Sequence, residues 1–496
     1  MALWRTGPAA ALLLVGGCTV GPNYHSPAVV VPPVYGGSPA AGSPGADLSQ
    51  WWAGFGDAAL NGLIERAQSG NLDVRQAAAR VEEARAQERV VRASGGPSVN
   101  AAGQAGYTRL SRNSLPPALT QLGGGGGGQS PGGAAIGLPG EGFATFQAGF
   151  DASWELDLFG GQRRANEAAA ARTSAAVWSQ RDAEVTLAAE VARTYERFRA
   201  LQRRIALADQ RLAAQREALD FIRVRTAHGL VNTLDERRQQ QNIEQLAAQR
   251  EDLLGQADAD IHALGTLLGL APTALGVELS GPAGAPPLIE VPAGLPSELL
   301  RRRPDIRAAE RRLAAATADI GVATADLYPK LSLTGALQLV SQSLATLLES
   351  GSLFANGAGR LSLPLIGGGK RETVALRRTQ ANEALIAYEA TIMGALRDVE
   401  DALTRLQADR HRIADLQASA SAAQDAADTA QVRQRNGLSP MTDVLQAGQA
   451  WLAARDALAQ ADAAAVQDEV ALYKALGGGW DERRVNEEDP ASGRSS

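Results

Sequence analysis

The chain contains the same structural pattern twice. Residues 72–107 align with residues 304–339, and residues 228–235 align with residues 436–443. The first copy is longer, because it carries an insertion that includes the glycine run 123–128. Each copy reads as a helix, two strands, a very long helix and a returning helix. A duplication of short strands and long helices suits a closed tube, which neither copy could form alone.

The amino terminus predicts a lipid-anchored, exported protein. Residues 1–17 read as a secretory signal, with one positive charge, an apolar run and small residues before Cys18. Cys18 is the only cysteine, so an intramolecular disulfide is excluded. Its position predicts lipidation, including palmitate, rather than an idle buried thiol. Thr19 follows it, which favours sorting to the outer membrane of a Gram-negative bacterium.

Charge and hydropathy argue against a nucleic-acid-binding protein and against a transmembrane helix. The net charge is −6, from 48 basic and 54 acidic residues, which gives no basic field for nucleic acid. No segment after the signal approaches the ~18 consecutive apolar residues of a transmembrane helix. The chain is therefore either attached to the membrane by its lipid alone or crosses the membrane as β-strands.

Two long helical hairpins are predicted, over residues 162–270 and 370–476. Residues 162–228 contain no glycine or proline, and an unbroken helix of that length would be ~100 Å long. A seven-residue repeat of apolar residues predicts a coiled coil. It comprises Val191, Phe198, Ile205, Leu212 and Leu219 in the first copy, and Leu385, Ile392, Val399, Leu406 and Ile413 in the second. Asn232 and Ser439 are predicted to cap the returning helices.

Four strands are predicted, over residues 97–112, 142–159, 329–341 and 357–366. From Phe146 to Leu158, apolar residues alternate with polar ones, so each strand has an apolar and a polar face. An ordinary half-buried sheet would show the same alternation, but glycine-rich loops and ~10-residue dyads favour an outer-membrane barrel. Four strands cannot close a barrel. Two chains would give a barrel filled by side chains, and three chains would leave a lumen.

No pattern indicates an enzyme, a metal site or a cofactor. The four histidines lack metal-binding spacing. The stretch Gly367-Gly368-Gly369-Lys370 is not a phosphate loop, because Pro364 stands where a glycine is required and Arg371 replaces the serine or threonine.

Several motifs together resemble those of a known family. They are CTVGPNY (18–24), WELDLFGGQRR (154–164), RRRPDIRAAE (301–310) and LSLPLIGGGKR (361–371). Over about residues 18–478 the chain resembles the outer membrane efflux channels of the TolC, OprM and NodT kind, in their lipoprotein branch. The resemblance implies a mainly α fold with membrane β: a homotrimer whose four strands per chain build a twelve-stranded barrel, continued by a helical barrel across the periplasm.

The resemblance also implies an organisation and a function. The expected parts are a lipidated segment (18–56), a first repeat (57–275), an equatorial linker (276–296), a second repeat (297–476) and a tail (477–496). The function implied is a passive duct that exports small toxic compounds or drugs, served by an inner-membrane pump and a periplasmic adaptor.

The resemblance assigns a gate to the periplasmic end. Asp443 occupies the position of an acidic residue that rings the mouth, whereas Gln446 stands where some relatives carry a second acid. Asp235 occupies the equivalent position in the first copy. In relatives an arginine can pair with this acid and tie the two tips together, but Ser439 stands at that arginine's position here. Arg435 could substitute for it, and the alternative is that Arg435 is solvated. The alternative for Asp443 is stabilisation of a helix N-terminus.

The turns between the long helices are the implied contacts with the adaptor. Gly229, Leu230, Gly437 and Leu438 match the family's tip motifs, and the glycines are also expected to end their helices. The competing hypotheses are a lipid-anchored coiled-coil scaffold or adaptor without a pore, and a periplasmic enzyme. Adaptors usually have one helical hairpin, whereas two are predicted here.

Overall fold

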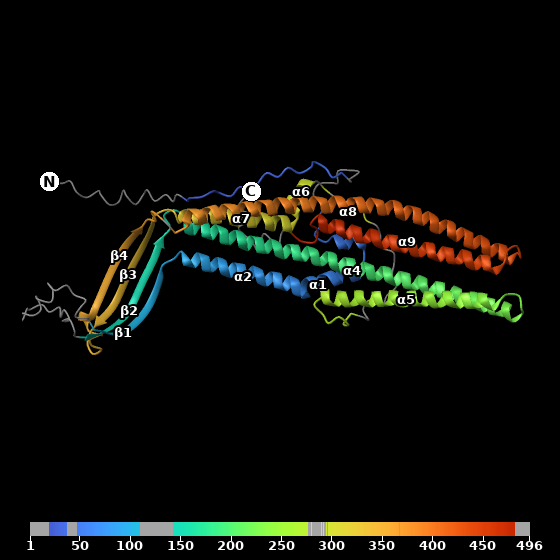
Figure 1. Ribbon diagram of the computed structural model, residues 1–496, viewed down its shortest axis with the longest axis horizontal. Helices are drawn as coiled ribbons and strands as arrows, with labels where there is room; N and C mark the ends of the chain where they lie inside the picture. Colours follow the sequence, from blue (N-terminus) through green and yellow to red (C-terminus); the bar gives the residue numbers. More distant parts are fainter. Residues whose placement is uncertain are drawn as a thin grey trace, which may run out of the picture. The chain divides into compact units, whose positions relative to one another are not determined.

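Figure 1 shows the computed structural model of the chain, which describes residues 19–36, 47–109, 142–275, 279, 289, 291, 294, 296–366 and 368–481. The chain divides into two compact units. The first comprises the residues up to 24, 86–170 and 314–382, and the second comprises 25–85, 171–313 and the residues from 383 onward.

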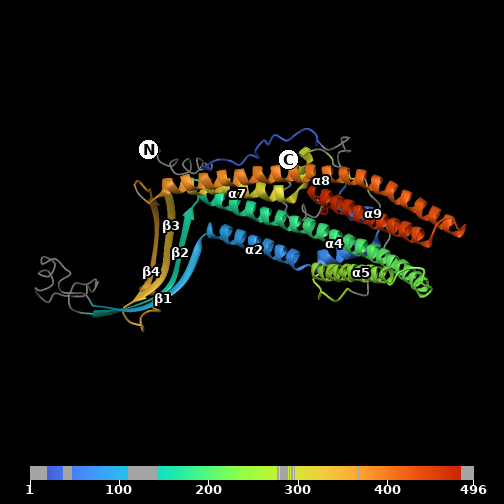
Figure 2. The ribbon, with the colours of Figure 1, turned by 45° about the vertical axis from the view of Figure 1, so that its right-hand side comes forward.

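The first unit contains one antiparallel sheet of four strands. Its members, in both chain and spatial order, are β1 (Ser98–Arg109), β2 (Gly142–Leu156), β3 (Lys330–Ser341) and β4 (Leu353–Ser362). Each copy of the duplication supplies one hairpin, and the pairing of β2 with β3 joins the copies. The strands curve along their length (Figure 2). Within the described residues β1 and β4 are the edges of this sheet, and each keeps one side unpaired.

The strand register gathers the apolar side chains on one face, as predicted. Phe150 lies opposite Ala101 and Leu337, and Leu337 lies opposite Ala355. The other face is polar, and there Asn100 donates a 3.2 Å hydrogen bond to Asp151. The apolar face is open: Phe150 is 58% exposed and Leu337 52%. Within the part of a single chain that the structure describes, this sheet therefore exposes large apolar side chains.

Two of the strands, β2 and β4, end earlier than predicted, for local reasons. β2 stops at Leu156, because Asp157 turns away and accepts the backbone N–H groups of Gln162 and Arg163. β4 runs over 353–362 rather than 357–366. Pro364 has no N–H to donate to a ladder, so pairing ends before it. Of the predicted 97–112, the structure describes a strand over 98–109.

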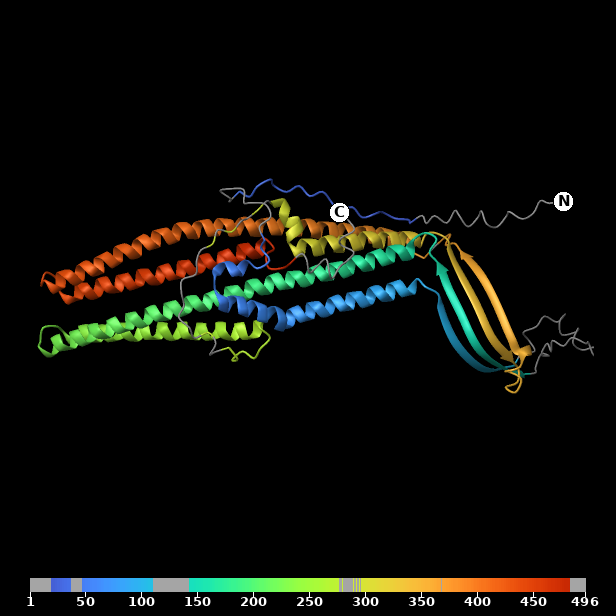
Figure 3. The same cartoon turned by 180° about the vertical axis from the view of Figure 1, so that it is seen from behind.

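The long helices form two matching hairpins. They are α4 (Gly161–Ala227) with α5 (Thr233–Leu267), and α8 (Lys370–Arg435) with α9 (Met441–Ala475). α5 and α9 each have 35 residues, and α4 and α8 have 67 and 66. In the second unit, both hairpin tips lie at the same end (Figures 1 and 3).

Shorter helices precede the strands in each copy. They are α1 (Ala58–Gly70) and α2 (Leu72–Ser94) in the first, and α6 (Pro296–Arg302) and α7 (Pro304–Ala325) in the second, with 3-10 turns η2 (Trp51–Phe55) and η4 (Ser350–Ser352). Within the described residues, none of the helices has both the length and the apolar character needed to cross a membrane.

Most residues of the predicted seven-residue repeats are buried in the second unit. Leu212 and Leu219 of α4 pack with Ile243 and Leu246 of α5 in one buried cluster. Ile392, Val399 and Leu406 of α8 are also buried. One polar pair interrupts the α4–α5 seam, where the Gln239 amide donates to Gln215. A polar pair inside an apolar seam favours one register, because any slip would leave it unpaired. Between hairpins, Arg204 of α4 contacts Asp456 of α9 at 2.8 Å.

Candidate functional site: the hairpin tips

Both long helices end in the same hydrogen-bonded turn. At the end of α4, the N–H of Leu230 donates to Arg225 O and the N–H of Gly229 donates to Thr226 O, each at 2.9 Å. At the end of α8, Leu438 and Gly437 repeat this pattern at 2.8 and 2.9 Å. The glycines have φ of +71° and +72°, a left-handed conformation that costs other residues energy. The expected helix-ending role of these glycines is therefore confirmed.

The leucines that follow these glycines project into solvent. A leucine at this position commonly packs back on the last helical turn. Here Leu230 is 65% exposed and Leu438 67%. Val224 and Val432, one turn before the two glycines, are also exposed. The matching exposure in both copies gives each tip an uncovered apolar surface, which we call the tip leucine surface for Leu230 and Leu438.

The returning helices begin differently in the two copies. Asn232 caps α5 as predicted, because its side-chain oxygen accepts the N–H of Leu234 at 3.1 Å. The prediction that Ser439 caps α9 is wrong. The cap residue is Pro440 and makes no side-chain hydrogen bond, while the buried Ser439 hydroxyl has no partner among the described residues. A residue before proline is held in an extended conformation, and Pro440 itself then occupies the cap position.

The predicted gate residues lie on both sides of the turns between the long and the returning helices. Asp443 is exposed at the start of α9, with Gln446 exposed one turn later, and Asp235 is exposed at the start of α5. Arg435 is exposed in the last turn of α8. Within the described part of this single chain, no ion pair joins Asp235 to Arg435. In the first copy the tip is instead tied by Arg223 of α4, which contacts Glu236 of α5 at 3.4 Å.

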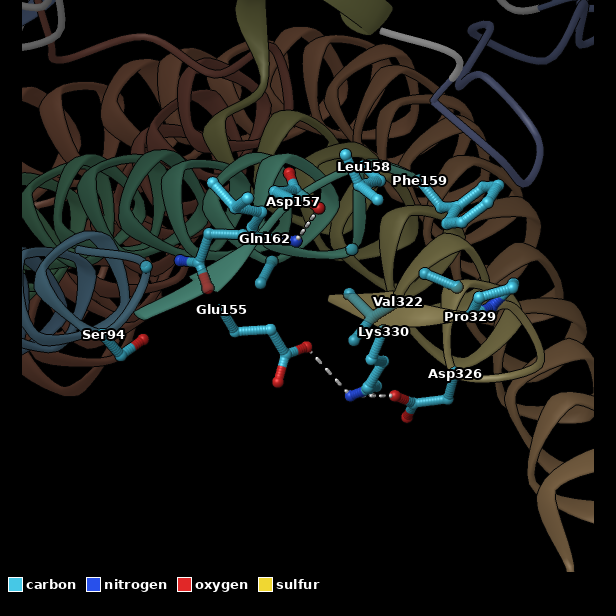
Figure 4. Close-up of a pocket in the computed structure, with 15 residues that line it drawn as sticks. Ser94, Glu155, Asp157, Leu158, Phe159, Gln162, Val322, Asp326, Pro329 and Lys330 are labelled. Atoms are coloured by element: carbon cyan, nitrogen blue, oxygen red, sulfur yellow. Dashed lines mark hydrogen bonds and ion pairs between the residues drawn. The ribbon is translucent and has the colours of Figure 1, made fainter. Parts of the chain in front are cut away.

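A second polar cluster, which the sequence analysis did not identify, lies in the first unit where the strands meet the helices (Figure 4). Lys330 Nζ lies 3.3 Å from Glu155 and 2.9 Å from Asp326, beside a cavity that Gln162 and Phe159 also line. The partners come from β2, β3 and the residues after α7. This cluster therefore connects both copies of the duplication at the joint between sheet and helices.

Buried carboxyl groups form a third feature that the sequence did not reveal. Glu469 of α9 has no exposed surface, and it accepts the backbone N–H of Ile289 at 3.3 Å. Burial raises the pKa of Glu469 to about 7, and burial also raises the pKa of Glu196 on α4 to about 7. Among the described residues, no group of histidine and acidic side chains could hold a metal ion.

Some predicted features lie outside the described residues. They are Cys18, the glycine run 123–128 and most of the linker 276–296. The lipidation of Cys18 stays a prediction.

Comparison with known proteins gives one consistent result. The family described as "Outer membrane efflux protein" matches residues 63–270 and 295–478, one segment for each copy. The chain is 33% identical to the outer membrane protein OprJ of Pseudomonas aeruginosa, over 95% of each chain. It is 31% identical to the solvent efflux pump outer membrane protein SrpC of Pseudomonas putida, over 96% of this chain and 98% of that one. The solved structure of the outer-membrane channel OprN superimposes with a TM-score of 0.82 at 33% identity, covering 93% of this chain and all of that one.

Proposed function

The chain belongs to the outer membrane efflux protein family, and we propose that three copies of it close into a passive exit duct that a periplasmic adaptor and an inner-membrane pump serve. It is an outer-membrane channel for efflux. The observation that supports the assembly is the open sheet. Among the described residues of one chain, both edges of the sheet are unpaired and large apolar side chains on one face are exposed.

Closure by three copies would pair the strand edges and place the apolar face against lipid. If β1 of one copy pairs with β4 of the next, three four-stranded sheets make one twelve-stranded barrel. No edge then remains, which is the condition for strands to cross lipid. The apolar face would meet the lipid, and the polar face with Asn100, Asp151 and Ser332 would line the lumen. A lumen lined by small polar groups gives no strong chemical selection, so the choice of exported compounds would fall to the pump.

The partners follow from the second unit. The tip leucine surface is the proposed contact for the adaptor, since it is apolar, exposed and the same in both copies. A lipid on Cys18 is the proposed additional anchor. The exported compounds are proposed to be small toxic molecules or drugs, in keeping with relatives named for the export of solvents and toluene.

The proposed lipid-facing side of the sheet can be tested with two neighbouring residues. Leu337 lies on the apolar face and Ala336 on the polar face of β3. Arginine at a lipid-facing position near the bilayer midplane costs about 2–4 kcal/mol. We therefore expect Leu337→Arg to reduce sharply the amount of assembled trimer in the outer membrane, and Ala336→Arg to spare it. Equal loss from both variants, measured by native gels of membrane extracts, would contradict the assignment of the faces.

The duct itself is tested by single-channel recording of the detergent-extracted protein in a planar bilayer. We expect small, cation-selective currents, because three Asp443 carboxylates would surround one narrow mouth. Asp443→Ala is expected to raise conductance and to reduce cation selectivity. Gln446→Ala is the matched control. Gln446 lies one turn away and is already uncharged, so its replacement removes no charge and should leave selectivity unchanged.

Two outcomes would redirect the interpretation. Unchanged current and selectivity in Asp443→Ala would return Asp443 to the role of stabilising the N-terminus of α9. Persistent silence from an intact trimer, including the Asp443→Ala variant, would favour a scaffold without a pore.

A further inference from the structure

We propose that α4 and α7 form a binding site for the chain's own N-terminal peptide, residues 19–24, and that Arg164 is the residue that holds this peptide in place. We call residues 19–24 the strap. All of the contacts that support this lie within the first unit. The proposal does not depend on conduction through the channel.

The centre of the site is a buried arginine that donates hydrogen bonds to the strap. Arg164, in the first turn of α4, is 4% exposed. Its Nε donates to Val20 O at 3.3 Å, and its Nη2 donates to Gly21 O at 3.4 Å and to Asn23 Oδ1 at 2.6 Å. Its Nη1 donates to Glu167 at 2.7 Å. A buried guanidinium needs its donors satisfied, and the strap supplies three of these four acceptors.

The strap also makes a backbone contact. The N–H of Val20 donates to Phe159 O at 3.1 Å, just after β2 ends. The protein thus binds the N–H group of Val20 and the carbonyl groups of Val20 and Gly21. Main-chain hydrogen bonds of this kind fix a peptide in one register, and here the peptide bends at Gly21.

Glycines make room for the strap at three points. A Cβ on Gly21, which has φ +90°, would come 2.5 Å from Gly321 Cα on α7. A Cβ on Gly321 would come 2.7 Å from Arg164 Cγ, and one on Gly160 would come 2.7 Å from Thr19. Glycine inside a helix is unfavourable, so the presence of Gly321 in α7, near its C-terminal end, needs an explanation. The close passage of the strap and of Arg164 supplies it.

The duplication provides an internal comparison that isolates the strap. Residue 321 of the second copy aligns with Arg89 of the first, an exposed residue of α2. Likewise Arg164 aligns with Glu372, which is exposed at the start of α8. The glycines before these helices are shared, since Gly160 and Gly368 have φ of +78° and +77°. The glycine turn before the long helix therefore occurs in both copies. Arg164 and Gly321, which contact the strap, occur in only one copy each, and charged, exposed residues stand at the aligned positions in the other.

The site gives the N-terminal segment a fixed point on the folded protein. The strap directly follows the predicted lipid-carrying residue, Cys18. Docking would therefore hold the anchored end of the chain beside Phe159, at the end of β2. In this way the strap would join the membrane anchor to the first turn of α4 rather than leave it on a loose tether.

The test is hydrogen–deuterium exchange on the intact detergent-extracted protein, read on peptides that contain Val20. Arg164→Met removes every donor while keeping an apolar stem. Gly321→Arg installs the residue of the other copy and improves helix propensity, so α7 should remain folded. Each variant is expected to speed exchange of the Val20 N–H by about ten-fold or more. Exchange in α9 is the internal control and should not change.

A milder variant keeps the test decisive if these substitutions impair folding. Asn23→Ala leaves Arg164 and the three glycines in place and removes one acceptor, so an increase of about three-fold is expected. Protection of Val20 that is unchanged in Asn23→Ala and in whichever of the other variants folds would overturn the proposal. The strap would then be held by chain connectivity or by lipid alone.

Discussion

Replacing Glu469 by glutamine is expected to stabilise the folded protein above pH 7 by about 2 kcal/mol per chain, and to have little effect near pH 4.5. Glu469 has no exposed surface, and its carboxyl group accepts a hydrogen bond from the backbone N–H of Ile289. Glutamine has nearly the same shape and keeps an oxygen that can accept this bond. The substitution therefore removes the buried charge without leaving a cavity.

The direction of the effect follows from the pKa of Glu469, which rises from 4.5 to about 7. Burial is the main cause, the hydrogen bond from the Ile289 N–H and the charge of Arg410 oppose it, and Glu196 raises the pKa further. Between these two pH values the unfolded chain has lost the proton that the folded chain still holds. Raising the pH through this interval therefore favours unfolding, and the parent loses stability. At 1.36 kcal/mol per pKa unit the full loss would be about 3 kcal/mol, and relaxation around the ionised group lowers it to about 2.

Thermal unfolding of the detergent-extracted protein at several pH values measures this effect. The difference between the Glu469→Gln variant and the parent should grow from pH 4.5 to pH 7 and then stay constant. Glu389→Gln, an exposed glutamate on α8, is the control and should follow the parent at every pH. A Glu469→Gln variant that is less stable than the parent at pH 8 would show that Glu469 is ionised in the folded state and stabilised by Arg410.

Most of the secondary structure could be predicted because its signals are local and repeat in the two copies. The alternation from Phe146 to Leu156 marks the faces of β2, and the register with Leu337 confirms them. Glycine and proline mark the ends of the long helices. The prediction of the α9 cap at Ser439 was wrong, because serine and proline are neighbouring candidates in the sequence and only the backbone conformation decides between them.

Of the candidate functional residues, only those at the hairpin tips could be predicted from the sequence. The turn around Gly229 and Gly437 is a local motif, so its geometry was within reach of the sequence. The burial of Glu469 was not, since it depends on Ile289 and on helices far away in the chain. Arg164 looked like one of two surface arginines in a GGQRR motif. The signal that could have identified it is the comparison of copies, in which Gly321 stands opposite Arg89.

Replacing both tip leucines by glutamate is expected to abolish export while leaving the channel assembled. Leu230 and Leu438 are exposed, so the charge costs the isolated protein little. In an apolar contact with an adaptor, each buried carboxylate would lack a partner and weaken binding by well over 1.4 kcal/mol, or ten-fold. Two such changes per chain act on every tip of the trimer. Accumulation of a fluorescent efflux substrate in cells that lack other outer-membrane channels measures the loss.

The double Leu→Met variant at the same two positions is the matched control, because methionine keeps an apolar surface of similar volume. It should export as the parent does. The single glutamate variants should fall between, since each leaves one of the two duplicated tips intact. Bilayer recording of the double glutamate variant separates docking from gating: the channel should still conduct and stay cation-selective, because the added carboxylates have the same sign as Asp443 and leave it in place. Export at the parental rate by the double glutamate variant would remove the tip leucine surface as the adaptor contact, and lost conductance would mean that the two tips contribute to the pore itself.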